Sequence, residues 1–254
     1  MNDMPTIQTN TLGELFAAAG PPAPLRELAI VAVKTEIDPV KSPALRDHWL
    51  SPLERDIPAP WKSAARRRHW FAGRIAARVA AQIFGWELKP DSITVTAHAS
   101  GAPFLTSPVG VLDCTITHSG NWAIACICPE GWQLGLDFEV GADERVHLAK
   151  RVCSRSQRTF HQLDVVENRQ AVQGTFGTIW TLKEALLKAW RVGLVSDLDA
   201  ILIGALPSRF DGQASIRLAK SISRGIPHPL PEESWNAITR WADAPLACVA
   251  VQRE

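Results

Sequence analysis

Two long segments of the chain have the periodicity of amphipathic helices, and short apolar segments with strand patterns lie around both. The first helical pattern covers about 63–84, and the second belongs to a region of helical segments between about 143 and 190. A helix with an apolar stripe is stable when a sheet or another helix covers that stripe. We therefore expect helix and strand to alternate in both halves of the chain.

The strand patterns are short runs of apolar and β-branched residues. They cover Leu28–Val33, Ile93–Thr96, Val111–Thr117, Trp122–Ile127, Trp132–Val140, Leu198–Ile203, Ser215–Leu218, Trp235–Trp241 and Leu246–Val251. We expect loops at 102–110 and 227–231, and a partly ordered arm over 1–25. The remaining chain is expected to form an N-terminal half, 26–128, and a C-terminal half, 129–254.

The charge balance gives no general signal for a nucleic-acid or membrane partner, because the chain has 27 Lys and Arg residues and 26 Asp and Glu residues. The five cysteines are odd in number and form no C-x-x-C pair, so they are expected to be reduced, buried thiols and not a zinc site. The N-terminus has no signal-peptide pattern, and no segment approaches the roughly 20 apolar residues of a membrane span. We expect a cytoplasmic protein.

The segment W-Q-L-G-L-D-F-E-V alternates larger apolar residues with Gln133, Gly135, Asp137 and Glu139. With the period of a strand, Asp137 and Glu139 leave the same face. Two carboxylates at this spacing can reach one hard cation, and magnesium prefers oxygen ligands. A solvated strand face is the simpler interpretation of an isolated pair, so the magnesium hypothesis needs a partner motif.

The segment G-T-I-W-T-L-K-E-A-L-L-K-A-W supplies such a motif. Its apolar stripe at helical spacing consists of Ile179, Leu182, Leu186 and Ala189. Glu184 and Lys188 lie four residues apart on the opposite side. A surface ion pair is the alternative, but together with Asp137 and Glu139 the helix predicts a three-carboxylate magnesium site beside an ammonium.

A third segment, C-T-I-T-H-S-G-N-W, places His118 between Thr117 and Ser119 at the end of an apolar strand. Hydroxyls, backbone N–H groups and an imidazole at a turn suit phosphate binding. A merely polar surface turn is the alternative.

The fourth feature is a helix with a basic edge, K-S-A-A-R-R-R-H-W-F-A-G-R-I-A-A-R. Arg67, Arg74 and Arg78 share a stripe at 100° per residue. The apolar side that we expect to be buried consists of Phe71, Ile75, Val79 and Ile83. Arginine suits phosphate because its planar fork donates two bonds at once, while a solvated face or nucleic-acid contact remain alternatives.

The order and spacing of these four segments resemble those of Sfp-type 4'-phosphopantetheinyl transferases of the holo-[acyl-carrier-protein] synthase superfamily, in particular members that serve siderophore synthesis. The resemblance covers about 50–194 and continues more faintly to the end of the chain. It implies an α+β fold of two similar halves related by a pseudo-two-fold axis, with coenzyme A in the cleft between them. It also implies a magnesium-dependent transfer of phosphopantetheine from coenzyme A to a serine of an apo acyl or peptidyl carrier protein, with release of adenosine 3',5'-bisphosphate.

Carried over by position, the resemblance assigns a role to each motif. Asp137, Glu139 and Glu184 would bind magnesium, and Lys188 would contact the pyrophosphate. The residues that would touch nucleotide phosphates are Thr117, His118 and Ser119, with Arg67 and Arg74 from the basic helix, where Arg66 and Arg68 compete with Arg67. Glu184 or a metal-bound water would take the serine proton, and Lys188 could stabilise or protonate the leaving phosphate.

Two positions depart from the pattern of the family. Ala102 stands where many members have a basic residue, and Gln157 stands where a glutamate is frequent. A catalytically silent homologue that binds coenzyme A or a carrier protein is an alternative function, against which the intact acidic and lysine positions argue. We expect a monomer with no nucleic-acid or membrane partner; the fatty-acid, polyketide, siderophore or peptide-synthetase identity of the carrier stays open.

Overall fold

The computed structural model divides into two compact units. It describes residues 4–164, 169–193, 198–219 and 234–252. Unit 1 consists of Met1–Glu14 and Leu25–Glu130, and unit 2 consists of Leu15–Pro24 and Gly131–Glu254. The loop expected at 227–231 lies outside the described residues.

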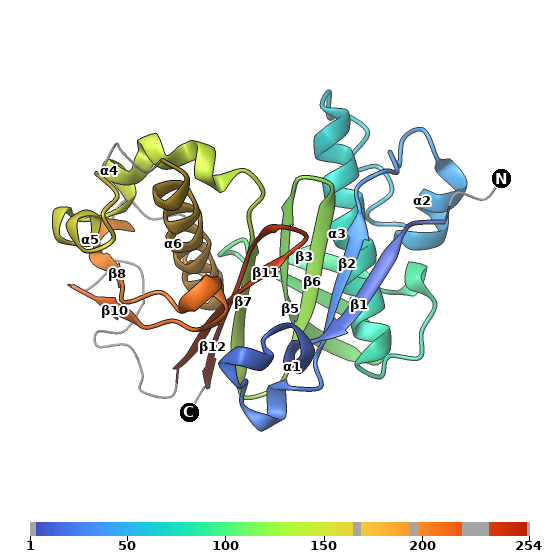
Figure 1. The fold of residues 1–254 in the computed structure, drawn as a ribbon. Helices are drawn as coiled ribbons and strands as arrows, with labels where there is room; N and C mark the ends of the chain where they lie inside the picture. The colour runs from blue at the N-terminus through green and yellow to red at the C-terminus, as the bar shows by residue number, and fades with distance from the viewer. Residues whose placement is uncertain (1–3, 165–168, 194–197, 220–233, 253–254) are drawn as a thin grey trace. The chain divides into compact units, whose positions relative to one another are not determined.

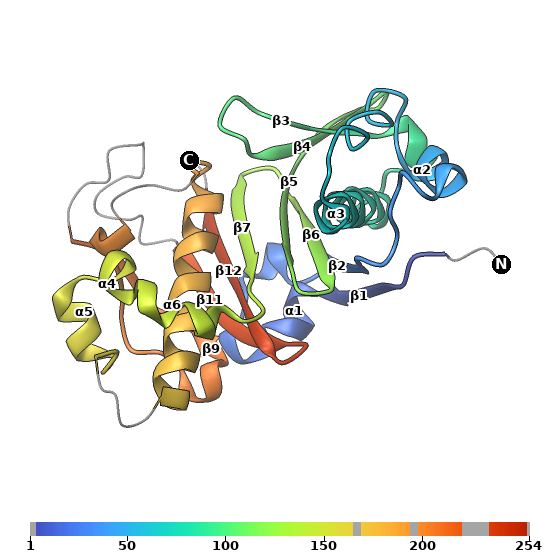
Figure 2. The same cartoon turned by 90° about the horizontal axis from the view of Figure 1, so that it is seen from above.

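Unit 1 contains a six-stranded antiparallel sheet and one long helix (Figures 1 and 2). The strands are β1 (Ile7–Thr11), β2 (Ala29–Lys34), β3 (Thr94–Ala97), β4 (Pro103–Ser107), β5 (Gly110–Ser119) and β6 (Trp122–Cys128). Their order in the sheet is β1-β2-β6-β5-β4-β3. The long helix, α3 (Ala64–Ile83), packs against β2, β5 and β6, which positions its residues beside the end of β5.

The start of α3 follows from its capping residue. Ser63 has an extended backbone, and its side chain accepts a hydrogen bond from the Arg66 N–H, as an N-cap does. The predicted buried side is confirmed at Phe71 and Ile75. It does not extend to Ile83 in the last turn, which is 53% exposed.

The loop expected at 102–110 is instead largely strand β4, paired with β3 and β5. Leu105 is fully buried in this sheet, whereas its neighbours on either side are only partly buried. Alternation over such a short run is hard to distinguish from a loop in the sequence. The pairing with two neighbouring strands decides it.

The arm expected over 1–25 is ordered in its described part. β1 pairs with β2 from Ile7 opposite Val33 to Thr11 opposite Ala29. Helix α1 (Leu12–Leu15) follows, and residues 17–19 and 23–25 form short 3₁₀ turns. Leu12 is fully buried. Backbone pairing and apolar burial, which act over long sequence separations, therefore fix this segment.

Unit 1 also contains helix α2 (Pro43–Trp49), and residues 90–92 form a 3₁₀ turn. α2 leads into the loop 50–55, which carries a buried glutamate, Glu54. Trp49 and Leu50 belong to the apolar core that α3 shares with the sheet.

Unit 2 packs a second long helix, α6 (Arg169–Ala189), against strands β7 (Trp132–Phe138) and β12 (Ala244–Gln252). The remaining elements are α4 (Ala149–Val152), α5 (Arg155–Phe160), β8 (Ile201–Ile203), β9 (Gly212–Gln213), β10 (Ile216–Leu218) and β11 (Ser234–Trp241). The sheets are antiparallel, one of order β7-β12-β11-β9 and one of β10-β8. Residues 142–148, 198–200 and 208–210 form 3₁₀ turns, so the strand expected at 198–203 is shorter than predicted.

The segment 15–24 belongs to unit 2 through specific contacts. Phe16 meets Trp235 edge to face at a centroid distance of 5.7 Å. The Ala19 carbonyl accepts hydrogen bonds from Gln213 Nε2 and Trp235 Nε1, both at 3.0 Å. These contacts join residues about 200 positions apart, which local sequence patterns cannot indicate.

Long helices and antiparallel sheets in both units confirm the α+β class. Within the described residues, no helix combines the length and apolar content that a bilayer span requires.

Candidate functional site

Strand β7 and helix α6 bring the two acidic motifs together in unit 2. Gly135 lies directly under the helix, because a Cβ at this position would be 1.9 Å from the Ala185 carbonyl oxygen and 2.4 Å from the Ala189 nitrogen. The strand face that carries Asp137 is thus covered by α6, and Asp137 is buried. The interpretation of this face as solvated is therefore wrong.

Lys188 lies over the end of β7. Its Nζ donates to Asp137 Oδ1 at 2.5 Å and to the Leu136 carbonyl at 3.2 Å. The pair predicted as an alternative, between Glu184 and Lys188 on the surface, is replaced by this contact from helix to strand. The Lys188 side chain remains 31% exposed.

Glu139 follows β7 and is held by two side chains. Trp180 Nε1 donates to Glu139 Oε1 at 3.4 Å, and Arg145 Nη1 lies 3.5 Å from Glu139 Oε2. Burial, followed by the negative charge of Asp137, raises the pKa of Glu139. The carboxylates of the D-x-E motif are therefore close enough to repel each other.

Glu184 is the third carboxylate of this cluster. Burial, with the charge of Asp137 next in size, raises the pKa of Glu184 to about 7, and Glu139 adds to the rise. Glu184 Oε1 is buried and has no hydrogen-bond partner among the residues that the structure describes. We name as the carboxylate cluster the three acidic residues together with the lysine that contacts one of them, which are Asp137, Glu139, Glu184 and Lys188.

The donor chemistry of the carboxylate cluster fits a hard cation. Its charged oxygens are of the kind that magnesium binds. Burial is the main cause of the raised pKa values of Glu139 and Glu184, and a cation would offset the repulsion between carboxylates that adds to it. The described residues do not, however, contain a group of three or more His, Cys, Asp or Glu side chains arranged to hold a metal. Because Lys188 occupies Asp137 Oδ1, a cation would have to share or replace that contact.

Lys183 is a buried ammonium that the sequence patterns did not single out. Its Nζ donates to the Val152 carbonyl at 2.6 Å, to Gln157 Oε1 at 2.9 Å and to the Leu198 carbonyl at 2.9 Å. Burial lowers the pKa of Lys183 to about 8. Gln157, noted for its departure from glutamate, is thus a neutral acceptor for Lys183.

Unit 1 contains a cavity of about 450 Å³ between α3, β5 and the segment before α3. Its lining consists of Trp61, Arg66, His69, Trp70, Gly73, Arg74, Ile116 and His118. The spacing of the helix residues, three, four and seven positions apart, places them on one face of α3. We name this cavity the arginine pocket.

Two arginines of the arginine pocket lie on tryptophan rings. The Arg66 guanidinium is 4.4 Å from the ring centre of Trp61, and the Arg74 guanidinium is 4.6 Å from that of Trp70. The two indoles meet edge to face at 5.7 Å. Stacking of this kind orients a guanidinium while leaving its N–H edge available for an anion.

Arg67, which the resemblance assigns to a phosphate contact, does not line the arginine pocket, and its phosphate role stays a prediction. Its guanidinium pairs with Asp38, with Nε 2.9 Å from Oδ1 and Nη2 2.5 Å from Oδ2, and it also donates to the Trp61 carbonyl. The hydrogen bond from Arg67 lowers the pKa of Asp38. Arg67 therefore connects α3 to the segment after β2. Arg66, which competes with Arg67 for the predicted phosphate contact, lines the arginine pocket.

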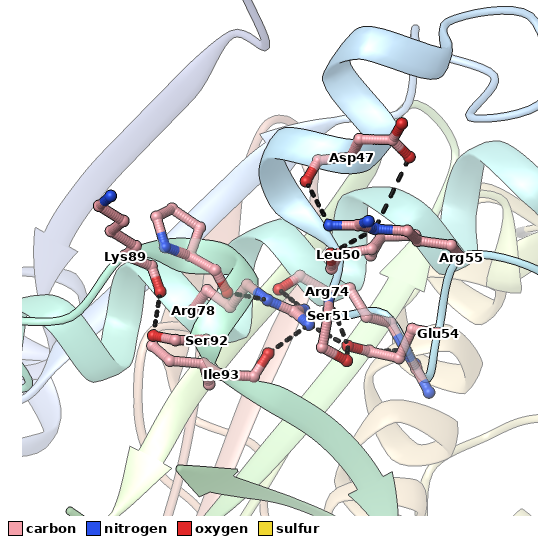
Figure 3. Close-up of polar contacts among 11 residues, drawn as sticks. Asp47, Leu50, Ser51, Glu54, Arg55, Arg74, Arg78, Lys89, Ser92 and Ile93 are labelled. Atoms are coloured by element: carbon pink, nitrogen blue, oxygen red, sulfur yellow. Dashed lines mark hydrogen bonds and ion pairs between the residues drawn. The ribbon is translucent and has the colours of Figure 1, made fainter. Parts of the chain in front are cut away.

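Arg78 also differs from the expected basic edge, because it is fully buried. Its guanidinium donates to the Pro90 carbonyl at 3.0 Å, to the Ile93 carbonyl at 2.7 Å and to Glu54 (Figure 3). The stripe therefore turns inward after Arg74. A charge that is paired and hydrogen-bonded is tolerated in a core, which helical periodicity cannot reveal.

His118 reaches the arginine pocket, whereas its neighbours do not line it. The imidazole stacks on that of His69 at a centroid distance of 5.0 Å and an interplanar angle of 7°. His69 Nε2 is 2.8 Å from the Gly120 carbonyl oxygen. Thr117 is buried and Ser119 is partly exposed on the strand, so their phosphate role stays a prediction.

Ala102 lies in the turn before β4, where its carbonyl accepts the His98 N–H at 2.9 Å. It is not among the lining residues of the arginine pocket. Sequence reasoning missed Trp61, His69 and Trp70 as lining residues. The signal that could have found them is their position one helical turn before Gly73 and Arg74, or just before the helix.

Residues 133–225 match the sequence model of the 4'-phosphopantetheinyl transferase superfamily. This span contains all four residues of the carboxylate cluster. Comparison with curated proteins returned no match.

Proposed function

We propose that the protein is an Sfp-type enzyme that transfers phosphopantetheine from coenzyme A to a serine of an apo carrier protein. The observation that carries this proposal is the placement of Glu184 and Lys188 of α6 against the Asp137 strand, all within the span that matches the transferase superfamily. The arginine pocket supports it as a site for phosphate. Magnesium, coenzyme A and the carrier protein belong to the proposal.

The reaction exchanges a phosphoanhydride bond for a phosphoester bond. The serine oxygen forms a bond to the phosphorus that carries the pantetheine arm, and the bond from this phosphorus to the bridging oxygen of the pyrophosphate breaks. The leaving group is adenosine 3',5'-bisphosphate, and the serine loses its proton. The catalytic groups must therefore orient the pyrophosphate, offset its negative charge and accept a proton.

Lys188 is placed to orient the pyrophosphate. An ammonium has three N–H donors, and the contacts with Asp137 and Leu136 account for two of them among the described residues. The third is available to a phosphate oxygen. Because Asp137 fixes the ammonium, less side-chain entropy is lost when phosphate binds.

Glu184 is the group that we propose to take the serine proton. Asp137 is engaged by Lys188, and Glu139 is held by Trp180 and Arg145, whereas Glu184 Oε1 has no hydrogen-bond partner among the described residues. Asp137, Glu139 and Glu184 would also hold magnesium, which when bound offsets charge on the phosphate oxygens.

The arginine pocket is proposed to bind a phosphate group of coenzyme A. Arg66 and Arg74 supply planar N–H edges, and His118 supplies a ring nitrogen. The neighbouring indoles exclude water from one side of each guanidinium, which strengthens its attraction for an anion.

The test is transfer of the arm to a carrier protein. The unaltered protein is incubated with coenzyme A, magnesium and a panel of apo fatty-acid, polyketide, siderophore and peptide-synthetase carriers, and each carrier is analysed by intact mass. We expect at least one carrier to gain the mass of phosphopantetheine on its serine, and Glu184→Gln to slow this gain at least about a hundredfold. Binding of coenzyme A without transfer to any carrier would instead indicate a catalytically silent homologue.

A further inference from the structure

Glu54 is a buried carboxylate that lies outside the motifs of the proposed reaction. It is 1% exposed and lies in the loop between α2 and α3. Its Oε2 accepts hydrogen bonds from the Ser51 hydroxyl at 2.7 Å, from the Ser51 N–H at 3.3 Å and from Arg78 Nη2 (Figure 3). One carboxylate oxygen is therefore saturated by the loop and by the helix.

The other oxygen of Glu54 faces the arginine pocket residue Arg74. Glu54 Oε1 lies 3.9 Å from Arg74 Nε, and neither atom has a hydrogen-bond partner among the described residues, although both are buried. A separation of 3.9 Å is too long for a hydrogen bond but gives strong Coulomb attraction in a buried setting. The Arg74 guanidinium is thus held between this carboxylate and the Trp70 ring.

The charges of this network do not cancel. Glu54 carries one negative charge, and Arg74 and Arg78 carry one positive charge each, so the trio has a net charge of +1. The Arg78 guanidinium donates hydrogen bonds to Glu54 and to backbone carbonyls. The uncompensated positive charge is therefore that of Arg74, which lines the arginine pocket.

We propose that Glu54 is a positioning residue for the anion site: it holds the Arg74 guanidinium against Trp70 in the orientation that meets a phosphate. This inference rests on the proposed function, because the phosphate is assigned to coenzyme A. Glu54 itself touches no ligand. It acts through Arg74, and Ser51 and Arg78 fix the carboxylate that does so.

The sign of the effect separates positioning from simple electrostatics. Removing the negative charge of Glu54 makes the surroundings of the pocket more positive, which alone would tighten anion binding. Loss of orientation has the opposite effect, because a misplaced guanidinium loses directional bonds to phosphate. Weaker binding in Glu54→Gln therefore supports positioning, and unchanged or tighter binding overturns it.

The experiment measures binding of coenzyme A and of inorganic pyrophosphate by calorimetry on the full chain. We expect Glu54→Gln to raise both dissociation constants at least about tenfold. In the Arg74→Met background the same change should have less than a twofold effect, because the residue through which Glu54 acts is absent. Equal losses in the two backgrounds would overturn the proposal.

Two further variants guard against a fold defect. Glu54→Asp keeps the charge that the buried Arg78 needs but withdraws the carboxylate from Arg74, so it should fold and bind pyrophosphate several-fold more weakly. Asp47→Asn is the matched control, since Asp47 pairs with Arg46 and Arg55 at the surface and not with α3. It should bind both ligands as the unaltered protein does. Normal pyrophosphate binding by a folded Glu54→Asp variant would also overturn the proposal.

The failure of this inference is distinguishable from failure of the proposed function. If the unaltered protein binds pyrophosphate but transfers nothing, the proposed function fails while the Glu54 variants still test positioning. If transfer occurs, Glu54→Gln should raise KM for coenzyme A with kcat within about twofold of normal, which a loss of active protein would not do. A protein that binds neither coenzyme A nor pyrophosphate would overturn both.

Discussion

Each of the two units packs one long helix on an antiparallel sheet, but the predominant charge of the groups at the contact differs in sign. In unit 1, α3 presents arginines that are stacked on indoles at the edge of a cavity. In unit 2, α6 places Glu184 and Lys188 beside Asp137 of strand β7. One site gathers cationic groups and the other gathers carboxylates.

The difference lies in how close each helix approaches its sheet. A Cβ at Gly73 in α3 would meet only the Ile116 side chain, at 3.1 Å, whereas a Cβ at Gly135 in β7 would lie inside the backbone of α6. The close approach in unit 2 buries Asp137 and shields Glu139 and Glu184 from solvent, which raises the pKa values of these two glutamates. The looser contact in unit 1 leaves room for a cavity.

The glycine pair gives the largest expected effect. Gly135→Ala should prevent folding of unit 2 or lower the free energy of unfolding by more than about 3 kcal/mol, because backbone atoms cannot move aside as a side chain does. Gly73→Ala should change it by less than about 1 kcal/mol, since the Ile116 contact can adjust and alanine favours a helix. Urea unfolding of both variants measures this. Similar losses would show that the two contacts are equally close.

Glu184→Gln addresses the carboxylate cluster. We expect the variant to fold normally, to need more magnesium and to turn over at least about a hundredfold more slowly, because a ligand and a proton acceptor are lost together. Glu144→Gln, at an exposed glutamate of the same unit, is the control. Steady-state rates over a magnesium series measure the effect, and normal turnover in Glu184→Gln would exclude the cluster as the reaction centre.

Arg66 and Arg67 are neighbours with different expected roles in unit 1. Arg66→Ala should weaken coenzyme A binding about tenfold and leave the melting temperature within about 2 °C, because Arg66 is exposed and lines the pocket. Arg67→Ala should lower the melting temperature and leave the coenzyme A affinity within about threefold, since it strands the buried Asp38. The reverse pattern, measured by calorimetry and thermal unfolding, would restore Arg67 as the phosphate ligand.

The free energy of unfolding should depend on pH differently in the two units. This is the smallest of the four expected effects. Burial lowers the pKa of His161 in unit 2, so the unfolded chain binds the proton more readily and stability is lost as pH falls below about 6.5. The lowered pKa of Asp38 in unit 1 costs stability only below about 3.8. Unfolding free energies at pH 7.5 and 5.5 should therefore fall less for His161→Gln than for the unaltered protein. An equal fall would exclude His161 as the source.

The resemblance of the sequence to a known family implied the α+β class. The sequence patterns by themselves determined the alternation of helix and strand, the helical segments and the candidate acidic residues. These follow from local periodicity, because the 3.6-residue and two-residue repeats show which residues share a face. The predicted buried stripe of α6 is confirmed at Ile179 and Leu186, which are fully buried. Periodicity placed Glu184 and Lys188 on one helix face, and the two acidic motifs together predicted the Asp137 strand as its partner. The contact between Lys188 and Asp137 is a finding of the structure.

Only the tertiary structure decided which charged side chains serve the fold. Arg66, Arg67 and Arg78 are chemically identical in the sequence, yet one lines a cavity, one pairs with Asp38 and one is buried against Glu54. The partners Asp38 and Glu54 lie 29 and 24 residues from the arginines that they bind. A charge is stable at a buried position only where folding brings such a partner close to it. Whether a partner is there depends on the packing of the whole chain and not on the local sequence pattern.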